Sequence, residues 1–179
     1  MDSHVVIADI VRSGFVEGHH YGSAVVLAAD GSVAREIGDA KQAILPRSCN
    51  KPIQALAMVR AGLDLEGELL ALACASHSGE DFHLDGVRRI LEGAGLTEDA
   101  LQTPADYPLD DHAREELIRA GGQKSSIHMN CSGKHAAMLA TCVKNDWPTD
   151  TYLEPGHPLQ QAIHETFAEL TGEEIKHIA

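Results

Sequence analysis

Positive charge and aromatic side chains are both scarce in this sequence of 179 residues. Lysine and arginine number 14 against 27 aspartates and glutamates, which gives a formal net charge of −13, and only 4% of the residues are aromatic. An acidic chain is repelled by the phosphates of nucleic acids, and no basic stretch with interleaved aromatics occurs. We therefore expect no nucleic-acid partner, and we expect small aliphatic side chains to fill most of the interior.

Long hydrophobic runs are also missing, since no stretch approaches the length that spans a bilayer. The first residues, Met1 to His4, contain no cationic region ahead of a hydrophobic one, which predicts that there is no secretory leader. The four cysteines form no C-x-x-C pair and are irregularly spaced: Cys49, Cys74, Cys131 and Cys142. Cysteines of this kind favour reduced thiols in the cytoplasm over disulfides.

The apolar content of 44% suits a globular chain, and the length predicts a single domain over residues 1–179. Residues 4–11 are rich in β-branched side chains and predict a strand. Two further apolar runs, Gly22 to Ala29 and Ser32 to Ile37, surround Asp30-Gly31, a dipeptide typical of hairpin turns. These three strands predict a small three-stranded sheet whose edges need cover.

From residue 50 onward the apolar spacing becomes helical. The predicted helices cover approximately residues 50–61, 67–75, 81–93, 111–120, 134–145 and 158–170. Strands followed by helices predict an α+β fold, with the N-terminal strands packed against a helical region. The final segment, Glu174 to Ala179, has the composition of another opening strand.

The sequence Arg47-Ser48-Cys49-Asn50-Lys51-Pro52 places a hydroxyl and an amine three residues apart at the start of a predicted helix. A serine hydroxyl becomes a useful nucleophile when a base takes its proton, and a desolvated lysine can be that base. Such Ser-x-x-Lys pairs form acyl-serine intermediates. The alternative is that Ser48 caps a surface helix and Lys51 is solvated.

A second polar group precedes the helix predicted at 134–145, where Cys131 and Lys134 lie three residues apart between His128 and His135. The Gly133-Lys134 pair is not a phosphate-binding loop, because the other positions of that motif do not match. Thiolates and imidazoles can ligate zinc. The alternative is a buried thiol near solvated histidines.

Three motifs and a loop together resemble the asparaginase II family, the serine β-lactamase-like asparaginases. The motifs begin at Arg47 (RSCNKPIQA), Ala73 (ACASHSGE) and Asn130 (NCSGKHA), and the loop begins at Tyr152 (YLEPGHP). They occur in the family's order, and the resemblance covers nearly the whole chain. It implies a serine β-lactamase/transpeptidase-like fold and the hydrolysis of L-asparagine to L-aspartate and ammonia through a covalent β-aspartyl serine.

The resemblance also implies roles for individual residues. Ser48 is the expected nucleophile, Lys51 its base and Ser76 a second hydroxyl that relays protons, with Ser78 a weaker candidate for that place. Cys131 and Lys134 match the family's zinc-binding pair, and a lysine ligand would have to be neutral. The expected substrate contacts are Arg47, His77 and Asn130. A surface arginine and an ordinary, partly buried histidine remain the alternatives for the first two.

One departure from the family concerns length. The family's members are longer, and their later half carries a cysteine in an Asp-Gly-Cys-Gly-Ala-Pro motif and a second catalytic lysine, neither of which occurs in this sequence. The expectation is therefore an N-terminal part of the fold with an incomplete zinc site. We expect a homodimer or association with a C-terminal fragment, and no membrane partner. The other functions left open are an acyl-serine hydrolase of the β-lactam or peptide amidase type, and an inactive remnant that binds amino acids or zinc.

Overall fold

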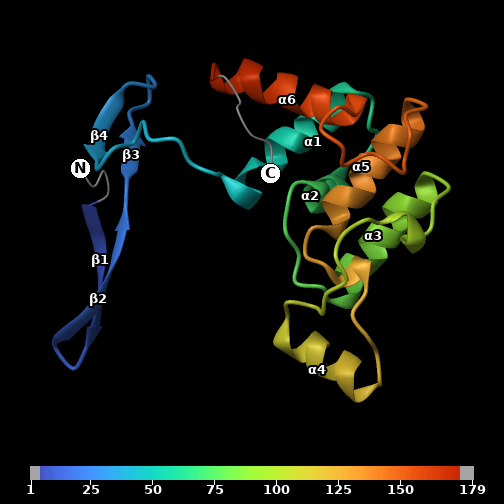
Figure 1. Cartoon of the computed structure of the whole chain (residues 1–179), viewed down its shortest axis with the longest axis horizontal. Coiled ribbons are helices and arrows are strands. Elements are labelled where there is room, and N and C mark those ends of the chain that lie inside the picture. The colour runs from blue at the N-terminus through green and yellow to red at the C-terminus, as the bar shows by residue number, and fades with distance from the viewer. Residues whose placement is uncertain (1–4, 174–179) are drawn as a thin grey trace. The chain divides into compact units, whose positions relative to one another are not determined.

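The computed structural model describes residues 5–173. The chain divides into two compact units, Met1–Leu45 and Pro46–Ala179, with strands in the first and helices in the second (Figure 1). This mixture of helices and small antiparallel sheets agrees with the predicted α+β class. The single domain over residues 1–179 stays a prediction. Among the described residues, no helix is both long enough and apolar enough to cross a membrane.

The first unit consists of two antiparallel hairpins. Strand β1 (Val5–Arg12) pairs with β2 (Phe15–Gly22), and β3 (Ala24–Leu27) pairs with β4 (Val33–Ile37). The predicted hairpin around Asp30-Gly31 is confirmed as β3–β4. Gly31 lies between its strands at a φ of 83°, a conformation that glycine adopts without steric cost.

The expected three-stranded sheet is wrong, because it omits β2 and because the strands form two separate sheets. Polar residues and two glycines interrupt β2, whose sequence is FVEGHHYG, so its apolar alternation is weak. The turn before it is Ser13-Gly14, and both residues have positive φ, 49° and 79°. Positive φ at both central positions is typical of the tight turns that join antiparallel strands. The Ser13-Gly14 dipeptide is therefore the local sequence signal for the β1–β2 hairpin.

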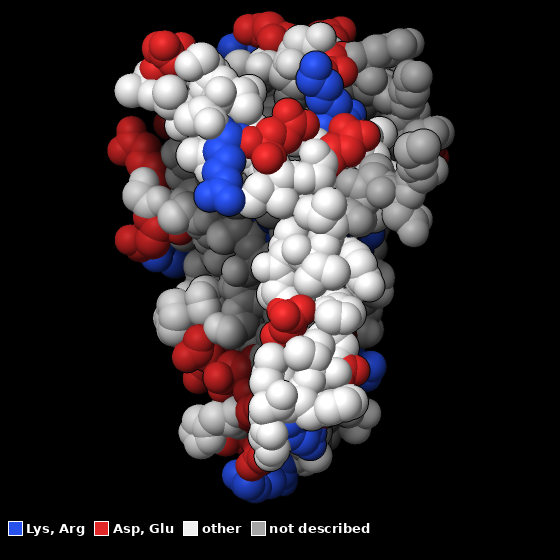
Figure 2. All heavy atoms as spheres, turned by 90° about the vertical axis from the view of Figure 1, so that its left-hand side faces the viewer, with Lys and Arg blue, Asp and Glu red and all other residues white. Residues whose placement is uncertain are grey.

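The strands of the first unit bury little apolar surface on one another. Every residue of β1 and β3 is exposed, and Phe15 of β2 is 70% exposed. In the space-filling view of Figure 2, uncharged side chains cover much of the face that is drawn, and lysine, arginine, aspartate and glutamate form smaller patches on it. A two-stranded hairpin is marginally stable in water by itself, so backbone pairing is the main interaction that the hairpins supply internally.

The second unit is helical. Its α-helices are α1 (Lys51–Arg60), α2 (Gly67–Ala73), α3 (Asp81–Gly93), α4 (Asp111–Arg119), α5 (Ser132–Lys144) and α6 (Pro158–Thr171). Three short 3₁₀ helices accompany them: η1 (Arg47–Asn50), η2 (Glu98–Ala100) and η3 (Ser126–His128). All six predicted helices are confirmed, and none of their ends differs from expectation by more than two residues. The strand expected from Glu174 lies outside the described residues.

Helix α5 is the centre of the helical unit, where it packs against α1, α2, α3, α6 and η3 (Figure 1). Ala136, Ala137 and Leu139 are fully buried on it. A Cβ atom at Gly133 would lie 2.6 Å from Cγ of Leu72 and 3.0 Å from its carbonyl oxygen. Gly133 therefore allows α5 to approach the end of α2, which is the segment that leads to Ser76.

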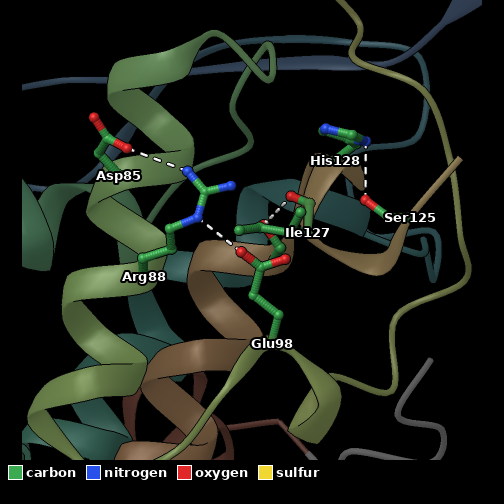
Figure 3. A network of polar contacts seen from close by, with 7 residues as sticks. Asp85, Arg88, Glu98, Ser125, Ile127 and His128 are labelled. Atoms are coloured by element: carbon green, nitrogen blue, oxygen red, sulfur yellow. Dashed lines mark hydrogen bonds and ion pairs between the residues drawn. The ribbon is translucent and has the colours of Figure 1, made fainter. Parts of the chain in front are cut away.

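An ion-pair network joins α3 to η2 (Figure 3). Arg88 Nε donates to Glu98 Oε1 at 2.7 Å, and Arg88 Nη1 donates to Asp85 Oδ1 at 3.2 Å. These side chains are 42% to 68% exposed, so water screens the charges and the network contributes modestly to stability. The Arg88–Glu98 pair ties the first residue of η2 to α3.

Candidate active site

Ser48 and Lys51 lie at the entrance to α1 but differ in exposure. Ser48 is exposed in η1, whereas Lys51 is the first residue of α1 and only 4% exposed. Pro52 follows within the first turn, where its missing N–H removes no helical hydrogen bond. The apolar residues Ala55, Ala57 and Met58 then bury the inner face of α1. The helix is therefore anchored with its lysine directed inward, which excludes the alternative of a solvated Lys51.

Ser76 connects the lysine to the serine of η1. Lys51 Nζ donates to Ser76 Oγ at 2.6 Å and to the carbonyl oxygen of Ala75 at 3.1 Å. Ser76 Oγ donates to Ser48 Oγ at 3.3 Å. Among the described residues, no hydrogen bond joins Lys51 directly to Ser48. The structure thus brings the three predicted catalytic residues together, with Ser76 in the middle of the chain of contacts.

The environment of Lys51 favours its neutral form. Burial lowers the pKa of Lys51 below its ordinary value; a charge on Cys131 opposes this shift, and the charge of Lys134 adds to it. Loss of hydration disfavours an ammonium more than an amine. A neutral amine has a lone pair that can accept a proton from Ser76, while one of its N–H groups still donates to the carbonyl oxygen of Ala75.

Ser78, the weaker candidate for the second hydroxyl, is directed elsewhere. Its Oγ donates to Glu80 Oε2 at 2.6 Å, and its carbonyl oxygen accepts from the backbone N–H of Asp110 at 2.9 Å. Ser78 therefore ties the segment after Ser76 to the loop before α4. These contacts favour Ser76 over Ser78 as the hydroxyl beside Lys51.

His77 and Asn130, two expected substrate contacts, meet each other through the backbone. The N–H of His77 donates to the carbonyl oxygen of Asn130 at 2.9 Å. His77 is 4% exposed, and its Nε2 lies 2.8 Å from Ser132 Oγ. Burial, then the charges of neighbouring cations, lowers the pKa of His77 to about 4. His77 is therefore neutral near pH 7 and held inside the helical unit.

Arg47, the third expected substrate contact, precedes the nucleophile candidate in an unusual backbone conformation. Its φ is 52°, in the left-handed region that residues other than glycine seldom adopt. Such a conformation costs on the order of 1 to 3 kcal/mol, which neighbouring structure has to supply. Its side chain is exposed, and within the described part of the chain it forms no hydrogen bond or ion pair. A guanidinium at this place is free to receive a carboxylate.

Cys131 and Lys134, the expected zinc pair, lie at the start of α5. Cys131 is its N-cap, and Cys131 Sγ lies 3.0 Å from Met129 Sδ. Burial lowers the pKa of Lys134, which favours the neutral amine that a metal would need. Two donors do not complete a tetrahedral site, and residues 5–173 contain no group of three or more His, Cys, Asp or Glu side chains placed to hold a metal. Cys131 and Lys134 therefore supply at most part of a zinc site within the described residues.

An open cleft of about 510 Å³ adjoins the second hydroxyl. It is lined by Ser76, His77, Ser78, Leu109, Asp110 and Asp111. Asp110 caps α4 by accepting from the N–H of Ala113 at 2.8 Å, so one wall of the cleft is held by the helix start. The cleft gives a small polar molecule access to Ser76.

Sequence reasoning gave no role to two buried polar residues around the site, Ser132 and Tyr152, and considered a third, His135, only as an imidazole beside the expected zinc pair. Ser132 is fully buried beside His77, and His135 Nδ1 lies 2.8 Å from the Tyr152 hydroxyl. That hydroxyl also accepts from the N–H of Gln102 at 3.3 Å. All three residues lie within segments quoted for the resemblance, but their partners are distant in sequence, so spacing alone did not predict the contacts.

Comparison with known families bears on this arrangement. A family profile described as L-asparaginase II matches residues 8–179. The chain belongs to the L-asparaginase II family. A search of curated proteins gives no match. Because the profile extends from β1 through α6, it includes every residue of the candidate site and both compact units.

Membership of the L-asparaginase II family indicates an asparaginase-type hydrolase with a small-molecule substrate. This agrees with a site that contains two exposed serine hydroxyls, a buried amine and an adjoining cleft. The roles of the individual residues do not follow from the family match.

Proposed function

We propose that the protein hydrolyses the side-chain amide of L-asparagine to L-aspartate and ammonia through an acyl-serine intermediate. The observation that carries this proposal is the chain of contacts from Ser48 Oγ to Ser76 Oγ to the buried amine of Lys51. A serine hydroxyl needs a base to become a nucleophile, and Lys51 is the base within reach through one intervening hydroxyl.

The proposed reaction begins with proton transfer along this chain. Both hydroxyls rotate, so that Ser48 donates to Ser76 and Ser76 donates to the lone pair of Lys51. Ser48 Oγ attacks the amide carbon, and the tetrahedral intermediate collapses as the C–N bond breaks. The leaving nitrogen takes a proton back from Lys51 through Ser76 and departs as ammonia. Water then attacks the β-aspartyl ester while its proton passes through Ser76 to Lys51. The ester C–O bond breaks, Ser48 Oγ takes the proton back, and aspartate is released.

Other groups are proposed to orient the substrate. The backbone N–H of Ser48, at the start of η1, is a candidate donor to the developing oxyanion. The exposed Arg47 guanidinium is proposed to bind the substrate carboxylate, and Asn130 to line the site beside it. A serine β-lactamase/transpeptidase-like architecture is the finer fold that we propose. We further propose that Cys131 and Lys134 contribute to a zinc site. We also propose a cytoplasmic location, and either a homodimer or a complex with a C-terminal fragment.

Replacement of Ser48 tests the proposal. We expect Ser48→Ala to lower the rate of ammonia release from asparagine by on the order of 10⁴-fold or more, since it removes the proposed nucleophile. Cys49→Ala is the matched control, because Cys49 is an exposed thiol in the same short helix and would be the competing nucleophile. It should retain turnover. Near-wild-type turnover by Ser48→Ala, or loss of turnover in Cys49→Ala alone, would contradict the assignment.

Mass spectrometry after brief exposure to substrate separates the alternative functions. A β-aspartyl adduct on the peptide containing Ser48 supports the asparagine reaction. An adduct formed only with a β-lactam or a peptide amide selects the other acyl-serine hydrolases. Asparagine binding by calorimetry without adduct or ammonia indicates a catalytically inactive binding protein.

A further inference from the structure

The segment that carries Ser76 is fastened at two places. On one side, Ala75 and Ser76 both accept hydrogen bonds from the amine of Lys51. On the other side, His77 is joined to the start of α5 by its backbone N–H on Asn130 and by its ring on Ser132. Ser76 therefore lies between two anchors, and the position of its hydroxyl depends on both.

The hydrogen-bond pattern around Ser132 fixes the tautomer of His77. Ser132 Oγ lies 2.7 Å from the carbonyl oxygen of Ile127, an atom that has no hydrogen to give. The single hydroxyl hydrogen of Ser132 is therefore used on Ile127, and the hydrogen in the contact with His77 comes from His77 Nε2. Figure 3 shows Ile127 near Ser125 and His128, with a polar contact marked beside it.

The other ring nitrogen of His77 is an acceptor in this tautomer. His77 Nδ1 is buried and has no partner among the described residues. The ring stacks on that of His83, with centroids 5.4 Å apart and an interplanar angle of 22°. The ring is thus held by its Nε2–H on one edge and by stacking on one face. The neutral ring of His77 is therefore fixed in orientation and is not solvated.

We propose that His77 is a positioning residue, whose Nε2–H bond to Ser132 holds the hydroxyl of Ser76 between Ser48 and Lys51. The proposal rests on the proposed function, because Ser76 matters to the rate only if protons pass through it. His77 is one residue from Ser76, so without the ring contact to Ser132 the backbone bond to Asn130 is the one described hydrogen bond left on this side of the segment. A misplacement of about 1 Å in a reacting constellation can lower a rate by about 100-fold.

Replacing His77 by glutamine or by asparagine distinguishes the effect of the Nε2–H hydrogen bond from the effect of side-chain volume. In His77→Gln the amide nitrogen can occupy the place of Nε2 and donate to Ser132, whereas the shorter side chain of His77→Asn places its amide near Nδ1. We expect His77→Gln to keep kcat within about 3-fold of wild type. We expect His77→Asn and His77→Leu to lose about 100-fold in kcat with less than about 3-fold change in KM, because Ser76 acts on chemistry rather than on binding.

Thr103→Val is the matched control for general loss of stability. Thr103 is 4% exposed, and its hydroxyl donates to the carbonyl oxygen of Ser126 at 2.8 Å, so its replacement also removes a buried hydrogen bond near η3. The described hydrogen bonds of Thr103 are made with Ser126 and not with residues 75–77. We expect its kcat, normalised to the folded fraction measured by thermal unfolding, to equal that of wild type.

The measurements are steady-state ammonia release by the purified protein, with Ser48→Ala assayed in parallel. Rescue by glutamine with loss by asparagine supports the proposal, even if the leucine variant fails to fold. Wild-type kcat in the folded asparagine variant overturns it, and so does a loss in the glutamine variant equal to that in the asparagine variant. If Ser48→Ala is also fully active, the proposed function fails, whereas an inactive Ser48→Ala beside an active His77→Asn defeats only the role of His77.

Discussion

Acidification should destabilise the helical unit through His77, whose environment opposes protonation. Burial lowers the pKa of His77 from 6.5 to about 4. Because the folded-state pKa is the lower one, the unfolded chain binds the proton first as the pH falls. Stability is therefore fully present above pH 6.5 and is lost progressively as the pH falls toward 4.

The magnitude follows from the two pKa values. One unit of pKa difference corresponds to about 1.4 kcal/mol, and the proton-binding integral gives a loss of about 2 kcal/mol between pH 7 and pH 5. The loss reaches about 3 kcal/mol at pH 4, where the folded protein also begins to bind the proton. This is a large fraction of the net stability of a typical domain.

Urea unfolding of wild type and His77→Gln at pH 7, 5 and 4, followed by circular dichroism, measures this contribution. Carboxylates titrate in both proteins, so the difference between the two acid losses isolates His77. His112→Gln is the control, because it also replaces a histidine by glutamine but at a side chain that is 76% exposed. Equal acid losses in wild type and His77→Gln would refute the reasoning.

Three further outcomes are expected. The turnover rate should rise with pH through the lowered pKa of Lys51, because the amine accepts a proton only when neutral; a kcat profile with its midpoint at or above 10.5 would contradict this. Gly133→Ala should cost about 1 to 3 kcal/mol of unfolding free energy because its Cβ would overlap Leu72, whereas Gly93→Ala, with nothing within 4 Å, should not destabilise. Tyr152→Phe should cost about 1 to 3 kcal/mol in thermal unfolding by leaving a buried imidazole nitrogen unpaired, and an unchanged melting temperature would disprove that.

The helices were predictable because their stopping residues and their apolar spacing are local. The helix expected at 81–93 has those bounds in the structure, and Gly95 follows it as a left-handed residue with a φ of 70°. Helix α5 begins two residues before the prediction, because Ser132 and Gly133 have the composition of a loop. Their place in the first turn depends on α2 and η3, which the local sequence does not contain.

The site was predictable only in part, for a related reason. The spacing of Ser48 and Lys51 indicated a nucleophile and a base, but it suggested direct contact between them. The structure inserts Ser76 between the two, because α1 directs its lysine into the unit and the end of α2 passes over it. The contact of His77 with Ser132 spans 55 residues, and no periodicity links such distant positions.

The interposed hydroxyl has a consequence for what a minimal version of this site requires. Ser48 of η1 and Lys51 of α1 lie on one continuous segment, but the contacts between them run through Ser76, in a turn that is hydrogen-bonded to the start of α5. A peptide that reproduced only residues 46–60 would contain both groups but would lack Ser76, the hydroxyl through which we propose that the proton passes. On the proposed mechanism, the smallest active fragment includes the loop after α2 and the beginning of α5, even though neither supplies the attacking atom.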